Sequence, residues 1–268
     1  MADTSLSVGA AFDAAVMQGD LIALVRLRRT LERIAALASC QRSIRRDSSI
    51  RTLGEALHDA TVPLLERGAA VVEWQRLMRW MSLLRAGESR NGCEELKALA
   101  AQRREKAARK YRQWLTQPGC RSARKRLARA LAHAVDEELS GIDLRGDWDT
   151  QRQDLSDVDV HAPASARHTV VVLQGWCEMW RRLGLDEPES AAHTRVGLLR
   201  SQQAMKMVSR LNNLLKHTQE PSAWQCAGVL QSQLQATADR HGDAARDAAL
   251  MMRLPLTPRF GVRDRPAH

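Results

Sequence analysis

Apolar residues recur at intervals of three and four positions through most of this 268-residue chain. That spacing places them on one face of an α-helix, whereas a half-buried strand would alternate at every second residue. The pattern is clearest between Leu21 and Leu37 and predicts a first amphipathic helix over about residues 20–38. Further helices are predicted over about 48–67, 69–85, 91–116, 120–139, 167–183, 188–217 and 221–252.

Glycine and proline set the expected helix boundaries. Gly68 and Gly87 follow the second and third predicted helices, at positions where a helix commonly ends. Pro188 and Pro221 stand at the start of the last two, where a missing N–H leaves no hydrogen bond unmade. Pro63 lies inside the second helix and is expected to kink it or end it early.

The stretch 140–166 departs from the helical pattern. It is rich in glycine, serine and aspartate and is expected to be a polar, acidic connector. The chain is therefore predicted to be all-α, with one helical block over 8–139 and a second over 167–252. Residues 253–268, rich in proline and arginine, are predicted to form a disordered tail.

Composition agrees with a soluble helical protein. Apolar residues make up 44% of the chain, too many for a disordered protein, and the 4% of aromatic residues is low for an all-β fold. No stretch approaches the ~18 uncharged apolar residues of a membrane helix. Acids precede the first cation, unlike in a secretory signal, so we expect a cytoplasmic protein. The five cysteines form no C-x-x-C pair, so reduced thiols are expected.

Positive charge is concentrated in one segment. The chain carries 41 lysines and arginines, 35 of them arginine, and a formal net charge of +10. Residues 97–129 hold twelve of these cations and one acid, so this predicted helical hairpin carries the whole excess. Arginine binds phosphate oxygens in two-point contacts, so the hairpin is either a site for a phosphate-rich polyanion or a solvated helix face.

The acidic residues gather directly after this hairpin. Residues 136–159 contain nine acids and two cations. They lack the central glycine and terminal glutamate of an EF-hand, so no calcium site is predicted. The segment is expected to fold against the basic hairpin or to stay solvated.

The chain contains none of the common catalytic or cofactor motifs. It has no GxxxxGK[ST], GxGxxG, GxSxG or HExxH sequence, so we expect neither enzyme activity nor a cofactor. His58 and Asp59 resemble the HD pair of helical metal-dependent phosphohydrolases. That site needs an earlier histidine and none precedes His58, so no metal site is expected.

Four stretches together resemble the CHAD family, the conserved histidine α-helical domain. Residues 25–34 (VRLRRTLERI) resemble its first arginine-rich helix, and residues 57–68 (LHDATVPLLERG) resemble its next acidic segment. Residues 104–131 resemble its basic helix, turn and following helix. Residues 191–205 and 229–239 resemble its H-x-x-R helix and its L-Q-x-x-L segment. The family's first histidine is absent here and its K-R-x-R-Y run is degenerate, so the chain resembles a divergent member.

The resemblance implies about eight helices in two bundles, related as a weak internal repeat around a basic groove or channel. Asp59 and Asp239 occupy equivalent places in the two halves. The resemblance further implies non-catalytic binding of inorganic polyphosphate and association with polyphosphate granules. The binding residues that it implies are Arg26, Arg28, Arg29, Arg33, Arg104, Arg109, Arg112, Arg124, His193, Arg195 and Arg200.

Two other interpretations stay open. A nucleic-acid-binding helical protein would carry the same cations, although the chain has no helix-turn-helix or RNA-binding signature. Most of the seven tryptophans are expected in the core, and Trp114 beside Arg112 is the one candidate platform for stacking bases. A degenerate scaffold that has lost its ligand would explain the missing histidine.

Overall fold

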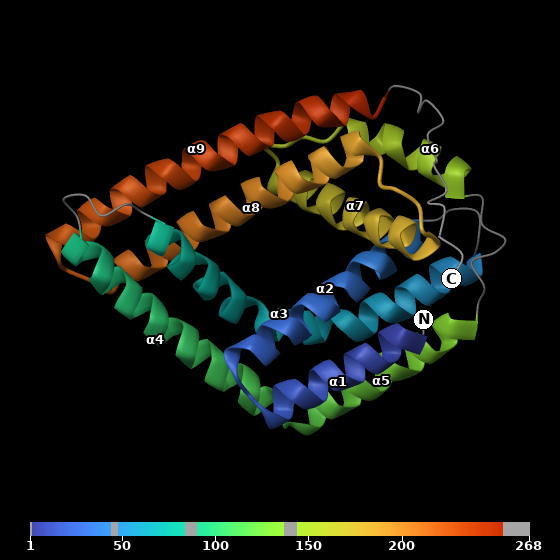
Figure 1. The fold of residues 1–268 in the computed structure, drawn as a ribbon, viewed down its shortest axis with the longest axis horizontal. Coiled ribbons are helices and arrows are strands. Elements are labelled where there is room, and N and C mark those ends of the chain that lie inside the picture. Colours follow the sequence, from blue (N-terminus) through green and yellow to red (C-terminus); the bar gives the residue numbers. More distant parts are fainter. Residues whose placement is uncertain (1, 44–47, 84–89, 137–143, 254–268) are drawn as a thin grey trace, which may run out of the picture.

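The computed structural model describes residues 2–43, 48–83, 90–136 and 144–253, and within these ranges every regular element is an α-helix, as predicted (Figure 1). The predicted tail from residue 254 onward lies outside the described residues. The helices are α1 (Ala2–Met17), α2 (Leu21–Ser43), α3 (Ser48–Leu83), α4 (Arg90–Leu115), α5 (Pro118–Asp136), α6 (Leu144–Ser156), α7 (Pro163–Leu183), α8 (Glu189–Leu215) and α9 (Pro221–Met251).

Helix α3 joins two of the predicted helices into one. It runs through Pro63 and does not end at Gly68. A Cβ atom at Gly68 would lie 3.0 Å from the ring of Tyr111 on α4, so this glycine makes room for a helix contact instead of ending the helix. Leu57 and Leu64 are fully buried along the same face, and their packing outweighs the local tendency of proline to break the helix.

The predicted connector contains helix α6, which the sequence pattern did not reveal. Trp148 of this helix is buried and packs edge-on against Trp176 and Trp180 of α7, at ring centroid distances of 5.4 and 4.8 Å. Arg152 reaches the end of α9 and donates a hydrogen bond to the carbonyl of Met252 at 2.7 Å. Helix α6 therefore packs on α7 and α9, while Asp154, Asp157 and Asp159 of the predicted acidic segment are exposed. Residues 137–143 of that segment lie outside the described residues.

The helices are arranged around a central space in Figure 1. Helices α8 and α9 run along one side, α1 and α5 run along the opposite side, and α4 connects the two sides. Helices α2, α3, α7 and α8 lie nearest to the centre. None of the helices in the described ranges is long and apolar enough to cross a membrane.

Two of the apolar cores share helices α3 and α4. The first core contains one fully or nearly fully buried side chain from each of α1 to α5: Phe12, Leu27, Leu64, Tyr111 and Leu127. The second core packs Trp74 and Leu96 of α3 and α4 against Leu211 and Leu230 of α8 and α9. Because α3 and α4 each enter both cores, they tie the two ends of the chain together.

Two glycines allow the inner helices to pack closely. A Cβ atom at Gly175 of α7 would collide with the backbone oxygen of Ala36 and the side chain of Cys40, both on α2. A Cβ atom at Gly197 of α8 would lie 2.8 Å from the Cβ of Ala245 on α9. These contacts hold α7 on α2 and α8 on α9, so they position the side chains that face the centre.

A disulfide bond joins Cys93 of α4 to Cys226 of α9, with Cα atoms 5.7 Å apart. The prediction that all thiols are reduced is wrong for this pair, whereas Cys40, Cys120 and Cys177 form no disulfide bond. The two residues are 133 positions apart in the sequence, so only the packing of α4 on α9 brings them together.

Candidate functional site

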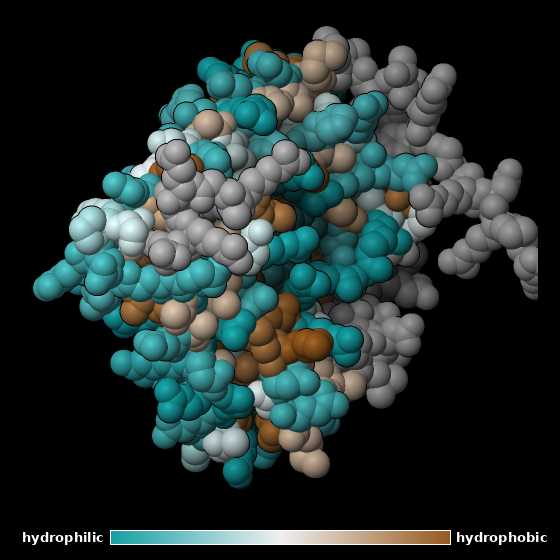
Figure 2. Space-filling model, turned by 60° about the vertical axis from the view of Figure 1, so that its left-hand side comes forward, coloured by the Kyte–Doolittle hydropathy of each residue, from teal (hydrophilic) through white to brown (hydrophobic). Residues whose placement is uncertain are grey.

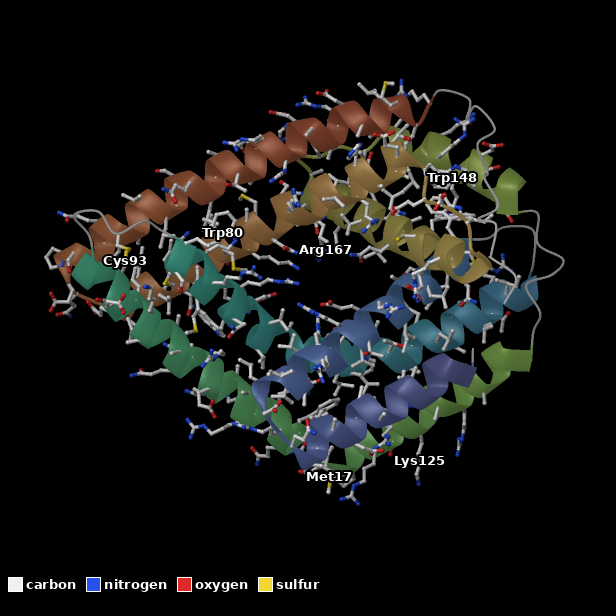
Figure 3. The ribbon with its side chains drawn as sticks, viewed as in Figure 1. Met17, Trp80, Cys93, Lys125, Trp148 and Arg167 are labelled. Carbon is white, nitrogen blue, oxygen red and sulfur yellow. A yellow bond between two sulfur atoms is a disulfide. The ribbon has the colours of Figure 1, made fainter. Side chains whose placement is uncertain are left out.

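Cations from four helices converge at the centre of the fold. Figure 3 shows nitrogen-tipped side chains reaching into the space between α2, α3, α7 and α8, with Arg167 among them. The central basic cluster is defined here as the five cations that influence one another electrostatically at this place: Arg28, Arg29, Arg76, Arg167 and Lys206.

Two members of the cluster have pKa values that burial and the other cations lower. The surrounding protein lowers the pKa of Lys206, and Arg167, Arg76 and Arg28 lower it further against the opposing effect of Glu73. Partial burial likewise lowers the pKa of Arg76. Since like charges disfavour one another's ionised form, a bound anion would relieve this repulsion.

Two carboxylates only partly balance the cluster. Glu32 accepts a hydrogen bond from Arg28 at 2.9 Å. Glu73 accepts one from Nε of Arg210 at 2.8 Å, and the guanidinium of Arg210 also lies 5.1 Å from the ring centroid of Trp74. Among the described residues, the cations that act on Arg76 or Lys206 are Arg28, Arg29, Arg76 and Arg167, with Glu32 and Glu73 opposing them.

One donor of the cluster is buried and has no partner among the described residues. Nη1 of Arg28 makes no hydrogen bond, although only 15% of this side chain is exposed. The hydroxyl of Tyr111 is also buried without a partner, and Arg28 acts on its pKa, which burial raises. Buried polar groups are normally hydrogen-bonded, so a free guanidinium N–H at a basic centre points to an anionic acceptor.

The predicted residues of α2 divide between the cluster and other places. Arg28 and Arg29 belong to the central basic cluster. Arg33 binds Glu178 of α7 at 3.0 Å, a carboxylate that also binds Arg181. Arg26 is exposed and lines a groove between α1 and α2, and Arg29, which is also exposed, lines the same groove.

The predicted residues of the basic hairpin hold helices together or face outward. Arg104 donates to the side chain of Gln75 at 2.8 Å, and Arg112 donates to the carbonyl of Gly19 at 2.9 Å. Arg124 pairs with Asp13 at 2.8 Å and lies over the ring of Phe12. Arg109 and most other cations of this hairpin are exposed, and Lys125 points away from the molecule in Figure 3.

The three predicted residues of α8 lie outside the cluster as defined. His193 is exposed, with Nδ1 3.9 Å from Glu189. Arg195 makes a two-point contact with Glu187 of the preceding turn, both distances being 2.8 Å. Arg200 is exposed, and it contributes with partial burial to lowering the pKa of His241.

Three cluster members were missed from the sequence. Arg76, Arg167 and Lys206 lie on three different helices, outside both the charge-rich segment and the matched arginines. The only sequence signal for these three cations is that each lies next to the apolar face of its helix. Many cations in helical proteins lie there, so this signal does not by itself indicate a binding site.

The tryptophans follow the prediction with one correction. Trp74, Trp148, Trp176 and Trp180 are buried. Trp114 stacks on Tyr111 and packs against the first core, so it is not an exposed platform for bases. The face turned toward the viewer in Figure 2 is mostly hydrophilic, with hydrophobic residues gathered in small areas.

Within the described residues, no three His, Cys, Asp or Glu side chains are grouped so that they could hold a metal ion. The Nδ1 atom of His58 lies 3.4 Å from its neighbour Asp59, whose side chain is 85% exposed. The pair therefore shows no further ligand that would complete a metal site.

Comparison with known proteins gives a match in structure alone. No protein-family model matches the chain, and a search of curated proteins finds no match. Among solved structures, PptA from Streptomyces chartreusis is similar, with a TM-score of 0.64 and 15% sequence identity. The similarity covers 92% of this chain and 95% of that chain, so the two share a fold over nearly their whole length.

Proposed function

We propose that this chain binds inorganic polyphosphate in the central basic cluster and does not hydrolyse it. The observation that carries the proposal is the convergence of Arg28, Arg29, Arg76, Arg167 and Lys206 from four helices, with one buried guanidinium N–H unpartnered. A polyphosphate chain offers a dense row of anionic oxygens and no base edges. Rigid helices that hold several guanidinium groups suit such a ligand, since each group binds two oxygens.

The fold supports the same proposal. The similarity to PptA is compatible with the CHAD-like fold that the sequence resemblance implied. The resemblance implies that members of that family bind polyphosphate at a basic centre. In this chain Arg28 and Arg76 of the central basic cluster are partly buried, whereas Arg29, Arg167 and Lys206 are exposed and accessible to a ligand. Association with polyphosphate granules would follow from binding of this kind.

The test is a titration of labelled polyphosphate against matched charge variants over a salt series. Arg28→Gln/Arg76→Gln removes two cluster cations, and Lys125→Gln/Arg126→Gln removes two exposed cations of α5. A hydrogen bond to a charged group contributes about 1.5–3 kcal/mol, so the first variant, which removes two such groups, should bind at least about 100-fold more weakly. The control should lose less than about fivefold, as for exposed charges.

The proposal fails if the two variants lose affinity equally, because binding would then depend on net charge and not on the cluster. Thermal unfolding of both variants checks that the fold is retained. Incubation of the protein with tripolyphosphate and Mg²⁺ or Mn²⁺ tests the absence of catalysis, and we expect no release of phosphate.

A second candidate function is nucleic-acid binding on the outer face of α4 and α5. It is favoured by the exposed cations of this hairpin: Lys106, Arg109, Lys110, Arg121, Lys125, Arg126 and Arg129. Phosphate contacts of this kind give sequence-independent binding that weakens steeply with salt. If duplex DNA binds as well as polyphosphate at physiological salt and Lys125→Gln/Arg126→Gln weakens it, this function replaces the first. If neither polyanion binds, the chain is a scaffold.

A further inference from the structure

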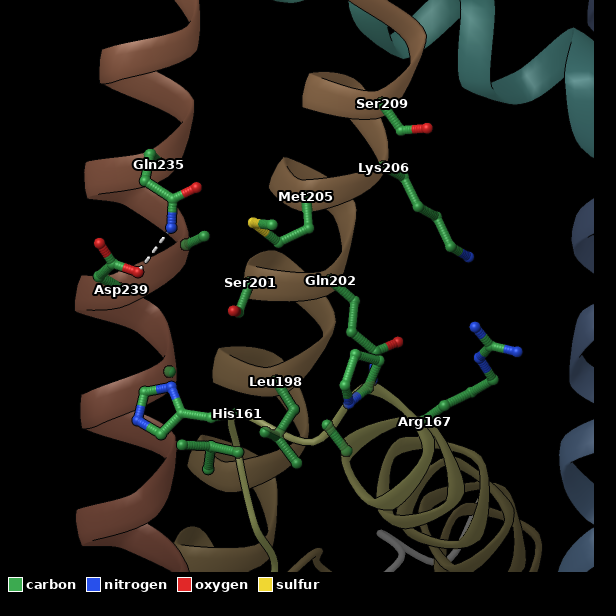
Figure 4. Close-up of a pocket in the computed structure, with 15 residues that line it drawn as sticks. His161, Arg167, Leu198, Ser201, Gln202, Met205, Lys206, Ser209, Gln235 and Asp239 are labelled. Atoms are coloured by element: carbon green, nitrogen blue, oxygen red, sulfur yellow. Dashed lines mark hydrogen bonds between the residues drawn. The ribbon is translucent and has the colours of Figure 1, made fainter. Parts of the chain in front are cut away.

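A pocket of about 420 Å³ opens between the start of α7 and the facing sides of α8 and α9 (Figure 4). Its volume is within the range of small-molecule sites, about 300–1,000 Å³. It is lined by residues of α8 and α9, by the first turn of α7 and by the residues just before α7. The pocket is therefore separate in place from the basic hairpin.

The pocket has one cationic side. Arg167 and Lys206 line it and also belong to the central basic cluster. In Figure 4 both side chains extend away from α9, on the side where α2 and α3 lie. A ligand that occupies the pocket could thus place an anionic group on the same cations that are proposed to bind polyphosphate.

The rest of the pocket combines apolar walls with a few amide and carboxylate groups. Leu198, Met205 and Ala238 supply apolar surface. On α9, Nε2 of Gln235 donates to Asp239 at 2.9 Å, which leaves the amide oxygen and the second carboxylate oxygen for other contacts. Apolar walls with a small number of donors and acceptors suit a ring that is apolar on its faces and polar at its edge.

Gln202 is the most specific feature of this surface. Its Nε2 atom is buried and has no hydrogen-bond partner among the described residues. Buried side-chain donors are normally satisfied, so an unpartnered amide in the wall of a pocket marks a place for a ligand acceptor. A simple phosphate chain would be held by the cations and would not need this group.

We infer that the pocket binds the base and sugar of a nucleoside phosphate, with its phosphates on Arg167 and Lys206. The ring lies between Leu198, Met205 and Ala238, and the amide of Gln202 donates to a ring acceptor. The inference rests on the proposed function only through the shared cations, because the pocket itself lies beside the cluster. A nucleoside phosphate would then compete with polyphosphate for the centre of the fold.

Calorimetry with the full chain tests this inference with three probes: adenosine triphosphate, inorganic tripolyphosphate and adenosine. Both phosphate probes carry three phosphates, so a difference between them reports the nucleoside. We expect adenosine triphosphate to bind at least about tenfold more tightly than tripolyphosphate at equal salt, since burial of the ring adds to the phosphate contacts.

A matched pair of glycine variants on α9 separates the pocket from general effects. Gly242 lines the pocket, and a Cβ atom there would lie in ordinary contact with Ser201 Oγ at 3.6 Å, so a side chain can begin at this position and Gly242→Leu should occupy part of the pocket. Gly228 is exposed and a Cβ atom there meets nothing within 4 Å, so Gly228→Leu is the control. Gly242→Leu and Gln202→Leu should abolish the preference for the nucleotide and leave tripolyphosphate binding unchanged, whereas Gly228→Leu should change neither.

The inference is overturned if the nucleotide binds no more tightly than tripolyphosphate, or if its preference survives Gly242→Leu. Either result leaves the proposed function standing, provided that Arg28→Gln/Arg76→Gln still weakens the binding of long polyphosphate. In the opposite outcome, the protein prefers the nucleotide, Gly242→Leu abolishes that preference, and long polyphosphate does not bind. That result would support the nucleotide pocket and refute the proposed function.

Discussion

The disulfide between Cys93 and Cys226 should contribute strongly to stability. It closes a loop with a sequence separation of 133 residues, and it joins the start of α4 to the start of α9. In the chain-entropy treatment, a loop of that size removes about 17 cal/mol/K from the unfolded chain, or about 5 kcal/mol at 25 °C. Measured values are commonly about 2–4 kcal/mol, because unfolded chains keep some structure.

The perturbation is reduction with dithiothreitol, compared with the variant Cys93→Ala/Cys226→Ala. For a chain of this size, each kcal/mol shifts the midpoint of thermal unfolding by about 2–4 °C, so reduction should lower it by about 5–15 °C. The variant should start from the lowered midpoint and should not respond to the reductant, since the other three cysteines form no disulfide bond.

Thiol titration in denaturant decides whether the reasoning holds. The unreduced protein should present three thiols and the reduced protein five. Five thiols before reduction, or an unchanged midpoint after it, would refute the stabilising bond. Because Cys226 is buried in the second core with Leu230 and Leu234, part of any loss in the alanine variant comes from packing, and the reductant arm isolates the bond.

Three further predictions concern packing, pH and reactivity. Gly175→Ala should destabilise the fold by about 1–3 kcal/mol through overpacking of α7 on α2, whereas Gly228→Ala should be neutral or stabilising, as measured by chemical denaturation. Burial raises the pKa of Glu178, but hydrogen bonds from two arginines outweigh burial and leave this pKa below its usual value. Its stabilisation is therefore present above the ordinary carboxyl pKa and lost as the pH falls below it, so the stability difference between the protein and Glu178→Gln should shrink between pH 6 and pH 3. Burial raises the pKa of Cys40 strongly and that of Cys177 less, so maleimide labelling followed by mass spectrometry should modify Cys177 first and Cys40 last; labelling of Cys40 at an equal rate would contradict this order.

The helices could be predicted wherever the apolar period was long. Helix α2 was expected over about 20–38 and runs over Leu21–Ser43, because its buried leucines repeat for several turns. Helix α6 has few such positions: Trp148 and Leu155 are buried among acids and glycine, and a pattern of two residues does not show a period. The Trp cluster with α7 stabilises that helix, and the partner is remote in sequence.

The densest run of cations proved a poor guide to the centre of the fold. Successive residues of a helix point about 100° apart, so a run of arginines on α4 and α5 faces several directions. Part of that run is engaged in local pairs, such as Arg124 with Asp13, and much of the rest is exposed. The resemblance in the first helix named Arg28 and Arg29, which act electrostatically on Arg76 of α3, and their role in binding stays a prediction.

The sequence by itself determined the helical class, most helix positions and the arginine-rich character of the chain, because these depend on local period and composition. Tertiary structure alone decided which cations meet. Arg28, Arg76, Arg167 and Lys206 lie on α2, α3, α7 and α8, and the packing of these four helices on one another brings the cations to one place. The same holds for Cys93 and Cys226. Contacts between distant segments follow from side-chain packing in three dimensions, which no spacing along the chain records.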